Sequence, residues 1–230
     1  INYTFSMDPL IPTTGLGVLH LFCKSNQSFD SEKLVEVIGK KNSDDMQIIS
    51  ISILGHKADF AFMMLSSDWV QLREIQRDIV NCGVDIADSY VSLTEISEYA
   101  AGVPEEMRRA RLYPELPPSD KRAWCFYPMS KRRNPTQNWF TLDFDKRKDL
   151  MYEHGASGRK FAGRVLQVIT GSTGIDDFEW GVTLFCLNPD DLKDVVYTMR
   201  FDIASAEYAE FGPFYSGFVG EIDEVVKLSV

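Results

Sequence analysis

One histidine stands where it could bind a metal. His154 lies within a predicted helix over 143–161, and the apolar residues three and four positions before it share its face. Gly155 and Gly158 leave space around the ring, at a cost in helix stability. The commoner role for such a histidine is a core residue that a backbone carbonyl satisfies. The alternative role is an axial ligand to a haem iron, with the two glycines admitting the macrocycle.

A polar residue interrupts one apolar strand. Gln167 stands in the sequence VLQVITG, whose apolar neighbours predict a strand buried on both faces. A buried amide has up to four hydrogen bonds to make. Gln167 could therefore pair with the backbone for structural reasons, or it could present a neutral side chain to a bound ligand. Both interpretations stay open at this point.

Aromatic and basic residues cluster near the end of another predicted strand. Tyr127 ends a strand over 122–127, and a run of three basic residues starts at Lys131. Arg111 and Arg200 could join them, and the planar fork of arginine suits carboxylates. The functional interpretation is a pocket for an anionic small molecule. The simpler one is a set of exposed ion pairs, which contribute little to stability.

The sequence gives little support for a zinc site, a serine nucleophile, a phosphate-binding loop or a cation site. The four cysteines are scattered and form no CxxC pair, which argues against zinc and favours reduced thiols. The chain has three histidines, and it has no GxSxG motif and no phosphate-binding loop in the right context. Asp176, Asp177 and Glu179 could bind a cation, but a solvated turn is the simpler explanation.

The composition is that of a globular protein. The 230 residues include 24 basic and 34 acidic side chains, and the net charge of -10 disfavours nucleic-acid binding. No apolar run is long enough for a membrane-spanning helix, and we see no signal peptide. We therefore expect a cytoplasmic protein.

The first half of the chain predicts alternating strands and helices. Ile49, Ile51 and Ile53 alternate with serines, which is typical of a strand, and Ser67 can cap the helix that follows the hairpin. The predicted order is β-α-β-β-α-β, the ferredoxin-like unit. Its elements are a strand over 18–22, a helix over 31–41, strands over 46–54 and 58–65, a helix over 68–81 and a strand over 85–98.

The same order returns after a proline-rich linker over 100–120. Asn188 and Pro189 mark the start of its last helix. We predict an α+β fold in which two ferredoxin-like halves, 1–110 and 111–230, pack as a dimeric α+β barrel with helices outside. The second half comprises a strand over 122–127, a helix over 143–161, strands over 163–171 and 178–187, a helix over 189–200 and a strand over 211–219.

Several motifs of the second half resemble the chlorite dismutase-like haem protein family. The resemblance is dense over 110–220 and weaker before it, where GHKADFAFMML (55–65) carries most of it. The matching motifs are YPMSKRR (127–133), NWF (138–140), EHGASGRKFAG (153–163), ITGSTGIDDFEWGVTLF (169–185) and YTMRFDIASAEYAEFGPFY (197–215).

The resemblance implies a branch within that family. His154 would be the proximal iron ligand, and the residue thirteen positions later, Gln167, would lie on the distal side. Members that decompose chlorite carry arginine there, whereas glutamine is typical of coproheme decarboxylases. The pair of Tyr127 and Lys131 belongs to the same branch.

That branch converts iron coproporphyrin III (coproheme), both substrate and redox cofactor, to haem b with hydrogen peroxide. Two propionates leave as carbon dioxide. The resemblance implies that Tyr127 forms the radical that abstracts hydrogen and that Lys131 assists the second step. Gln167 would stay neutral above the iron. Arg111, Lys131, Arg200 and Ser205 would anchor propionates, and the protein would be a homopentamer.

Three departures from the family pattern accompany these implications. Phe140 stands where tyrosine is common, and we expect a packing role for it. His56 stands in a turn where glutamine is expected, and we expect no consequence. The gap between Arg111 and Tyr127 is short, so Arg108 and Arg109 are alternatives to Arg111.

Three other functions remain alternatives. The first is another haem enzyme of the family, with peroxidase or chlorite activity. The second is a non-enzymatic haem-binding or haem-delivery protein, which would have no need of an oxidisable Tyr127. The third is a haem-free barrel that binds a different anion.

Overall fold

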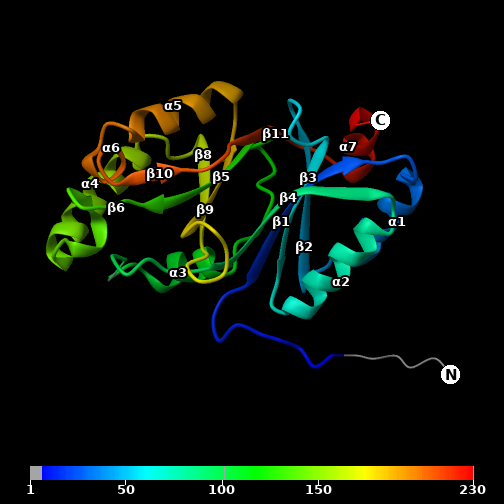
Figure 1. Ribbon diagram of the computed structural model, residues 1–230, viewed down its shortest axis with the longest axis horizontal. Helices are drawn as coiled ribbons and strands as arrows, with labels where there is room; N and C mark the ends of the chain where they lie inside the picture. Colours follow the sequence, from blue (N-terminus) through cyan, green and yellow to red (C-terminus); the bar gives the residue numbers. More distant parts are fainter. Residues whose placement is uncertain (1–6, 101, 230) are drawn as a thin grey trace.

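The first half forms the predicted ferredoxin-like unit. The computed structural model describes residues 7–100 and 102–229 (Figure 1). The four strands of this half lie in the order β2-β3-β1-β4, and all neighbours are antiparallel. Its elements are β1 (Gly17–Ser25), α1 (Ser31–Lys41), β2 (Met46–Ile53), β3 (Phe60–Ser66), α2 (Trp69–Val80) and β4 (Val84–Thr94).

The second half repeats the unit with the equivalent strand order, β8-β9-β5-β11. Both predicted β-α-β-β-α-β orders are therefore confirmed. The elements are β5 (Ala123–Lys131), α4 (Phe144–Arg159), β8 (Val165–Gly171), β9 (Trp180–Cys186), α5 (Pro189–Met199) and β11 (Tyr215–Val219).

The two sheets join edge to edge into a closed barrel. β4 pairs with β8 at one seam, and β11 pairs with β2 at the other. Because β5 also pairs with β9, every one of these strands has two neighbours, and no edge is left open. The short β10 (Ala209–Phe211) extends the sheet alongside the far end of β5.

Alternation along β5 shows how the sequence builds this barrel. Trp124 and Phe126 point into the barrel interior, where they pack with side chains of the first half. Cys125 and Tyr127 point outward, into a second cluster that includes Val195 of α5. Each buried apolar side chain contributes about 1.5–3 kcal/mol, so both faces of β5 stabilise the fold. The outer face also carries the candidate site.

Several short elements were not predicted. The linker contains α3 (Glu105–Leu112), which buries none of its residues and so gives no amphipathic signal in the sequence. The others are the hairpin of β6 (Arg133–Asn134) and β7 (Gln137–Asn138), the 3₁₀ turn η1 (Trp139–Thr141), α6 (Ile203–Ala206) and α7 (Ile222–Ser229).

Two local predictions are wrong. The cap of α2 is Asp68 rather than Ser67, because the Asp68 carboxylate accepts the backbone N–H of Val70 at 2.9 Å. Tyr127 does not end its strand, because pairing with β9 and β10 carries β5 on to Lys131.

The structure bears on the state of the cysteines and on membrane-spanning helices. All four cysteines are buried free thiols, as predicted. Across 7–100 and 102–229, the structure contains no helix with both the length and the apolar character needed to cross a membrane.

Candidate functional site

His154 is held by a carboxylate. Its Nδ1 lies 3.0 and 3.1 Å from the two carboxylate oxygens of Asp202, and 3.3 Å from Oγ of Ser205. Asp202 also caps α6 by accepting the backbone N–H of Ser205 at 3.0 Å. Because Nδ1 is engaged in these hydrogen bonds, Nε2 is the ring nitrogen left for a metal. A carboxylate behind a histidine fixes its tautomer and raises its basicity as a ligand.

The pKa of Asp202 reflects this arrangement. Burial acts to raise the pKa, since the side chain is nearly inaccessible to solvent. The hydrogen bonds from His154 and Ser205 outweigh burial and hold the pKa of Asp202 below its ordinary value. Asp202 is therefore ionised beside His154 at neutral pH. No sequence pattern pointed to this partner, because 48 residues separate the two side chains.

Gln167 lies on the outer face of the second sheet. It pairs across β8 and β9 with Leu184, which in turn pairs with Cys125 of β5. The prediction that β8 is buried on both faces is wrong, because Gln167 is exposed and Ile169 on the same face is 38% exposed. The reason is that α5 packs over β5 and β9, whereas α4 packs mainly against α5 and α6. An apolar strip of β8 is left uncovered beside Gln167.

Tyr127 lies in the adjacent row of the same face. Tyr127, Val182 and Ile169 pair in sequence across β5, β9 and β8. The phenol ring is buried and stacks on Phe214, with ring centroids 4.4 Å apart. Burial raises the pKa of Tyr127, the Cys125 thiol adds to the rise, and the Arg200 guanidinium opposes it. Tyr127 is thus a neutral phenol.

Lys131 is buried and tied to α6. Its Nζ donates to the carbonyl oxygen of Ala204 at 2.6 Å and lies 4.3 Å from the ring centroid of Trp139. Burial lowers the pKa of Lys131 to about 8, although Asp202 and Glu179 act to raise it. A lysine with this pKa can both hold and release a proton near neutral pH.

The remaining predicted anchors occupy different positions. Ser205 is buried against His154, as described above. Arg200 is exposed, and its guanidinium lies 4.8 Å from the ring centroid of Phe211, next to Tyr127. Arg111 is exposed in the last turn of α3 and forms no hydrogen bond or ion pair with the other candidates. The structure thus gathers all the candidates except Arg111 near α6 and the outer face.

The acidic residues after β8 serve structural purposes. The expectation of a fully solvated turn is wrong for Glu179, which is buried, pairs with Arg133 and accepts the backbone N–H of Lys131 at 2.8 Å. Asp176 accepts the backbone N–H of Val91 at 2.8 Å. Among the described residues, no group of three or more His, Cys, Asp or Glu side chains could hold a metal ion.

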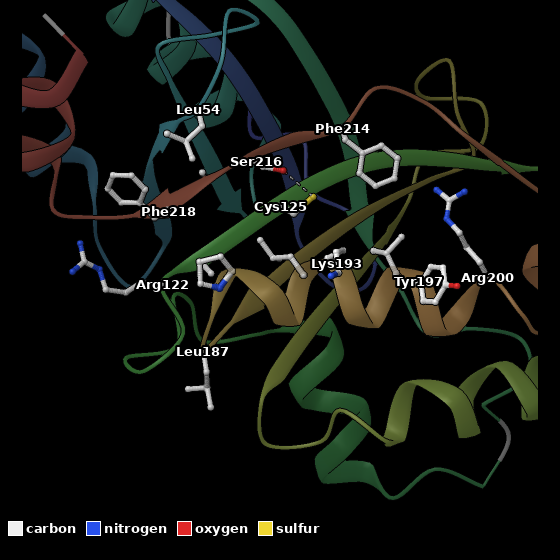
Figure 2. A pocket seen from close by; sticks show the side chains of 15 residues that line it. Leu54, Arg122, Cys125, Leu187, Lys193, Tyr197, Arg200, Phe214, Ser216 and Phe218 are labelled. Atoms are coloured by element: carbon white, nitrogen blue, oxygen red, sulfur yellow. Dashed lines mark hydrogen bonds between the residues drawn. The ribbon is translucent and has the colours of Figure 1, made fainter.

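An apolar groove of about 880 Å³ runs beside this region (Figure 2). It lies between α5 and the outer faces of β5 and β11, with Cys125 and Ser216 on its floor and Arg200 at one end. None of its lining residues comes from α4 or β8. The groove is therefore distinct from the surroundings of His154 and Gln167, and its lining residue Arg200 also lies against Phe211, which packs on Tyr127.

These residues fit an iron porphyrin. His154 offers Nε2 from a rigid helix, and the uncovered strip of β8 offers an apolar surface to a flat macrocycle. Gln167 supplies a neutral amide on that surface, and Arg200 supplies a cation for a carboxylate. A phenol, Tyr127, and an amine, Lys131, lie on the same face of β5, so the chemistry of these side chains suits a macrocycle with anionic side chains.

Comparisons with known proteins agree with this interpretation. The sequence profile of the family described as chlorite dismutase matches residues 27–219. A coproheme decarboxylase of Staphylococcus carnosus is 45% identical over 82% of this chain and 78% of its own length. A protein of Natronomonas pharaonis named as haem-binding is 42% identical over 82% of this chain, and the match spans about a third (34%) of that relative.

A solved structure gives the same picture of the fold. A haem-binding protein from Thermus thermophilus has a TM-score of 0.83 and 33% identity, with 94% of this chain and 96% of that chain covered.

Proposed function

Because the chain belongs to the chlorite dismutase family, we propose that it is a coproheme decarboxylase that converts iron coproporphyrin III to haem b with hydrogen peroxide. The observation that carries this proposal is the placement of Tyr127 and Gln167 on one sheet face, in adjacent rows. An oxidisable phenol and a neutral amide suit hydrogen abstraction from a propionate. The 45% identity to a coproheme decarboxylase supports the same choice.

Binding would rest on both sides of the macrocycle. His154 would hold the iron through Nε2, with Asp202 fixing the ring from behind. Arg200 and Ser205 would anchor propionates, and Arg111 would complete the set if α3 moves toward the substrate. A substrate with four carboxylates needs several such donors, and bidentate arginine is well suited to the task.

The reaction must remove a hydrogen and a carboxyl group from each of two propionates. Each propionic acid and one hydrogen peroxide give a vinyl group, one carbon dioxide and two water molecules. The bound iron porphyrin supplies the oxidising capacity when peroxide reacts with it. Tyr127 would give up an electron and its phenolic proton, and then regain a hydrogen atom from the propionate carbon nearest the ring.

Lys131 and Gln167 would control charge around that step. The Lys131 ammonium would stabilise the carboxylate about to leave, and its pKa of about 8 allows proton exchange there. Gln167 adds no positive charge to the distal surface, so it does not attract an anion such as chlorite. The family's chlorite-decomposing chemistry is for this reason the less suitable alternative.

The test is a titration of the protein with iron coproporphyrin III and hydrogen peroxide, followed by mass spectrometry. We expect two successive losses of a carboxyl group, which end at haem b. Tight binding without mass loss would contradict decarboxylation. It would favour haem binding without catalysis. The Natronomonas and Thermus relatives are named only as haem-binding proteins.

The assembly state is a further part of the proposal. Leu54 and Leu187, which line the groove of Figure 2, are 68% and 39% exposed. Exposed apolar side chains of this kind are common at subunit contacts. We expect a homopentamer, and light scattering after size-exclusion chromatography would measure it directly.

A further inference from the structure

A carboxylate lies on the same sheet face as Gln167. Glu95, the residue that follows β4, reaches over Gly171 of β8, where the Glu95 carboxylate fills the space that a Cβ of residue 171 would need. The Trp180 indole N–H donates to the other Glu95 oxygen at 3.0 Å. A glycine inside a strand often marks such a close approach. Gly171 and Trp180 therefore fix the Glu95 carboxylate against the outer face.

Its position can be given relative to the proposed reactive groups. Met129, Trp180 and Gly171 pair in one row across β5, β9 and β8, with Glu95 over the Gly171 end. Tyr127 and Lys131 flank Met129 on the same face of β5. Two strand spacings, about 10 Å, separate the β5 end from the β8 end. This row therefore has a buried phenol and a buried amine beside one end and an exposed carboxylate at the other.

The Glu95 carboxylate is not neutralised by a cation. Among the residues that the structure describes, it forms no ion pair, and its hydrogen bond comes from a neutral indole. Burial raises the pKa of Glu95, and the hydrogen bond from Trp180 counteracts the rise by stabilising the ionised form. Any anionic group placed at this end of the row meets a like charge.

The negative charge of Glu95 can distinguish the edges of the substrate, because the substrate carries its carboxylates asymmetrically. Each edge of a porphyrin carries one side chain from each of two neighbouring pyrrole rings. In coproporphyrin III, two edges pair a propionate with a methyl, one edge pairs two propionates, and one pairs two methyls. The propionates that haem b retains are the two that share an edge. Each propionate that is lost has a methyl beside it.

We propose that Glu95, held by Trp180 over Gly171, is a specificity residue that determines which edge of the substrate lies across β5, β9 and β8. This inference rests on the proposed function. An edge with a propionate and a methyl can place the propionate beside Tyr127 and Lys131 and the methyl against Glu95. The edge with two propionates would force a carboxylate against Glu95 and is rejected. In both accepted edges the propionate and the methyl follow each other in the same direction around the ring. Both edges can therefore lie against the sheet face without turning the macrocycle over.

Binding of metal-free porphyrins tests the inference without catalysis. Coproporphyrin I pairs a propionate with a methyl at every edge, whereas uroporphyrin I presents two carboxylates at every edge. The variant Glu95→Gln keeps an acceptor for Trp180 and removes the charge. Glu98→Gln is the matched control, because Glu98 lies on the same segment, is exposed and faces Arg147 at 3.8 Å.

We expect the ratio of the uroporphyrin I Kd to the coproporphyrin I Kd, measured by fluorescence titration, to fall about five-fold in Glu95→Gln. The ratio should stay at the wild-type value in Glu98→Gln. An unchanged ratio in Glu95→Gln would overturn the inference and leave the proposed function standing. If the wild-type protein binds both porphyrins equally well, the inference is also overturned. If it binds neither of them nor iron coproporphyrin III, the proposed function fails and the inference fails with it.

The products of a single turnover provide a second readout. With iron coproporphyrin III and one equivalent of peroxide, the wild-type protein should remove only a propionate that has a methyl beside it. Glu95→Gln should also remove propionates from the paired edge, which NMR of the isolated product distinguishes. If both proteins give the same isomers in the same proportions, Glu95 does not select the edge.

Discussion

The Asp202 carboxylate lies 3.0 Å from Nδ1 of His154; His154 lies in α4, and Asp202 is the N-cap of α6. The same turn accepts the Lys131 ammonium through the carbonyl of Ala204. One short helix therefore connects the proposed iron ligand with the proposed catalytic amine.

Replacing Asp202 tests the role of this carboxylate. The change Asp202→Asn keeps a side chain that can cap α6 but removes the charge behind His154. We expect affinity for the iron porphyrin to fall about 10- to 100-fold, since partners behind a metal-binding histidine have effects of this size. The iron–histidine stretching frequency in resonance Raman spectra should also fall. An unchanged frequency would show that Asp202 does not tune His154.

Gln167 offers a test of distal charge. The change Gln167→Arg should strengthen binding of small anions such as cyanide or fluoride to the loaded protein, roughly tenfold, because a cation would face the bound anion. Gln167→Leu is the control that removes the amide without adding charge. Equal anion affinities in the arginine and leucine variants would place residue 167 away from the iron.

Lys131 should give the folded protein a distinctive pH dependence. Its pKa is lowered to about 8 by burial, whereas the unfolded chain keeps the ordinary value near 10.4. Between these two values the unfolded state binds more protons, so this group makes the free energy of unfolding rise with pH, by about 1 kcal/mol per pH unit. Below pH 8 the lysine is charged in both states and gives no slope.

Urea unfolding at several pH values between 8 and 10 would measure this slope. Lys131→Met keeps an apolar stem and removes the titrating group, so the difference between wild type and variant isolates Lys131. If wild type and Lys131→Met show equal slopes, the pKa of Lys131 is not lowered in the folded protein.

Activity should follow the same titration in the opposite direction. As pH rises through about 8, Lys131 loses its proton, and the ammonium can no longer stabilise a departing carboxylate. We expect the second decarboxylation to slow over this range more than the first. Stopped-flow absorption with separate rates for the two steps would show it, and parallel pH profiles for both steps would contradict the proposed role.

The architecture could be predicted from the sequence because its signals are local. The alternation of Ile49, Ile51 and Ile53 sets the faces of β2, and Asn188 with Pro189 starts α5. The short α6 carries no such signal, since four residues are too few for a helical period. Yet α6 positions Asp202, Ala204 and Ser205.

The site could be predicted only in part, for two physical reasons. The contact between His154 and Asp202 joins distant parts of the chain, and it depends on where α6 packs. The apolar sequence around Gln167 predicts that the strand avoids water, but it does not show which element covers each face of the strand. In β8 the apolar residue Ile169 lies on a face that none of the helices in the described part of the chain covers fully.

The most direct test of the central claim compares wild type with Tyr127→Phe by mass spectrometry. The variant keeps the ring that stacks on Phe214, and the phenol has no hydrogen-bond partner among the described residues, so folding and porphyrin binding should be retained. With iron coproporphyrin III and excess peroxide, we expect wild type to yield haem b and the variant to lose carboxyl groups at least about a hundredfold more slowly. If Tyr127→Phe forms haem b at the wild-type rate, Tyr127 is not the residue that takes hydrogen from the propionate.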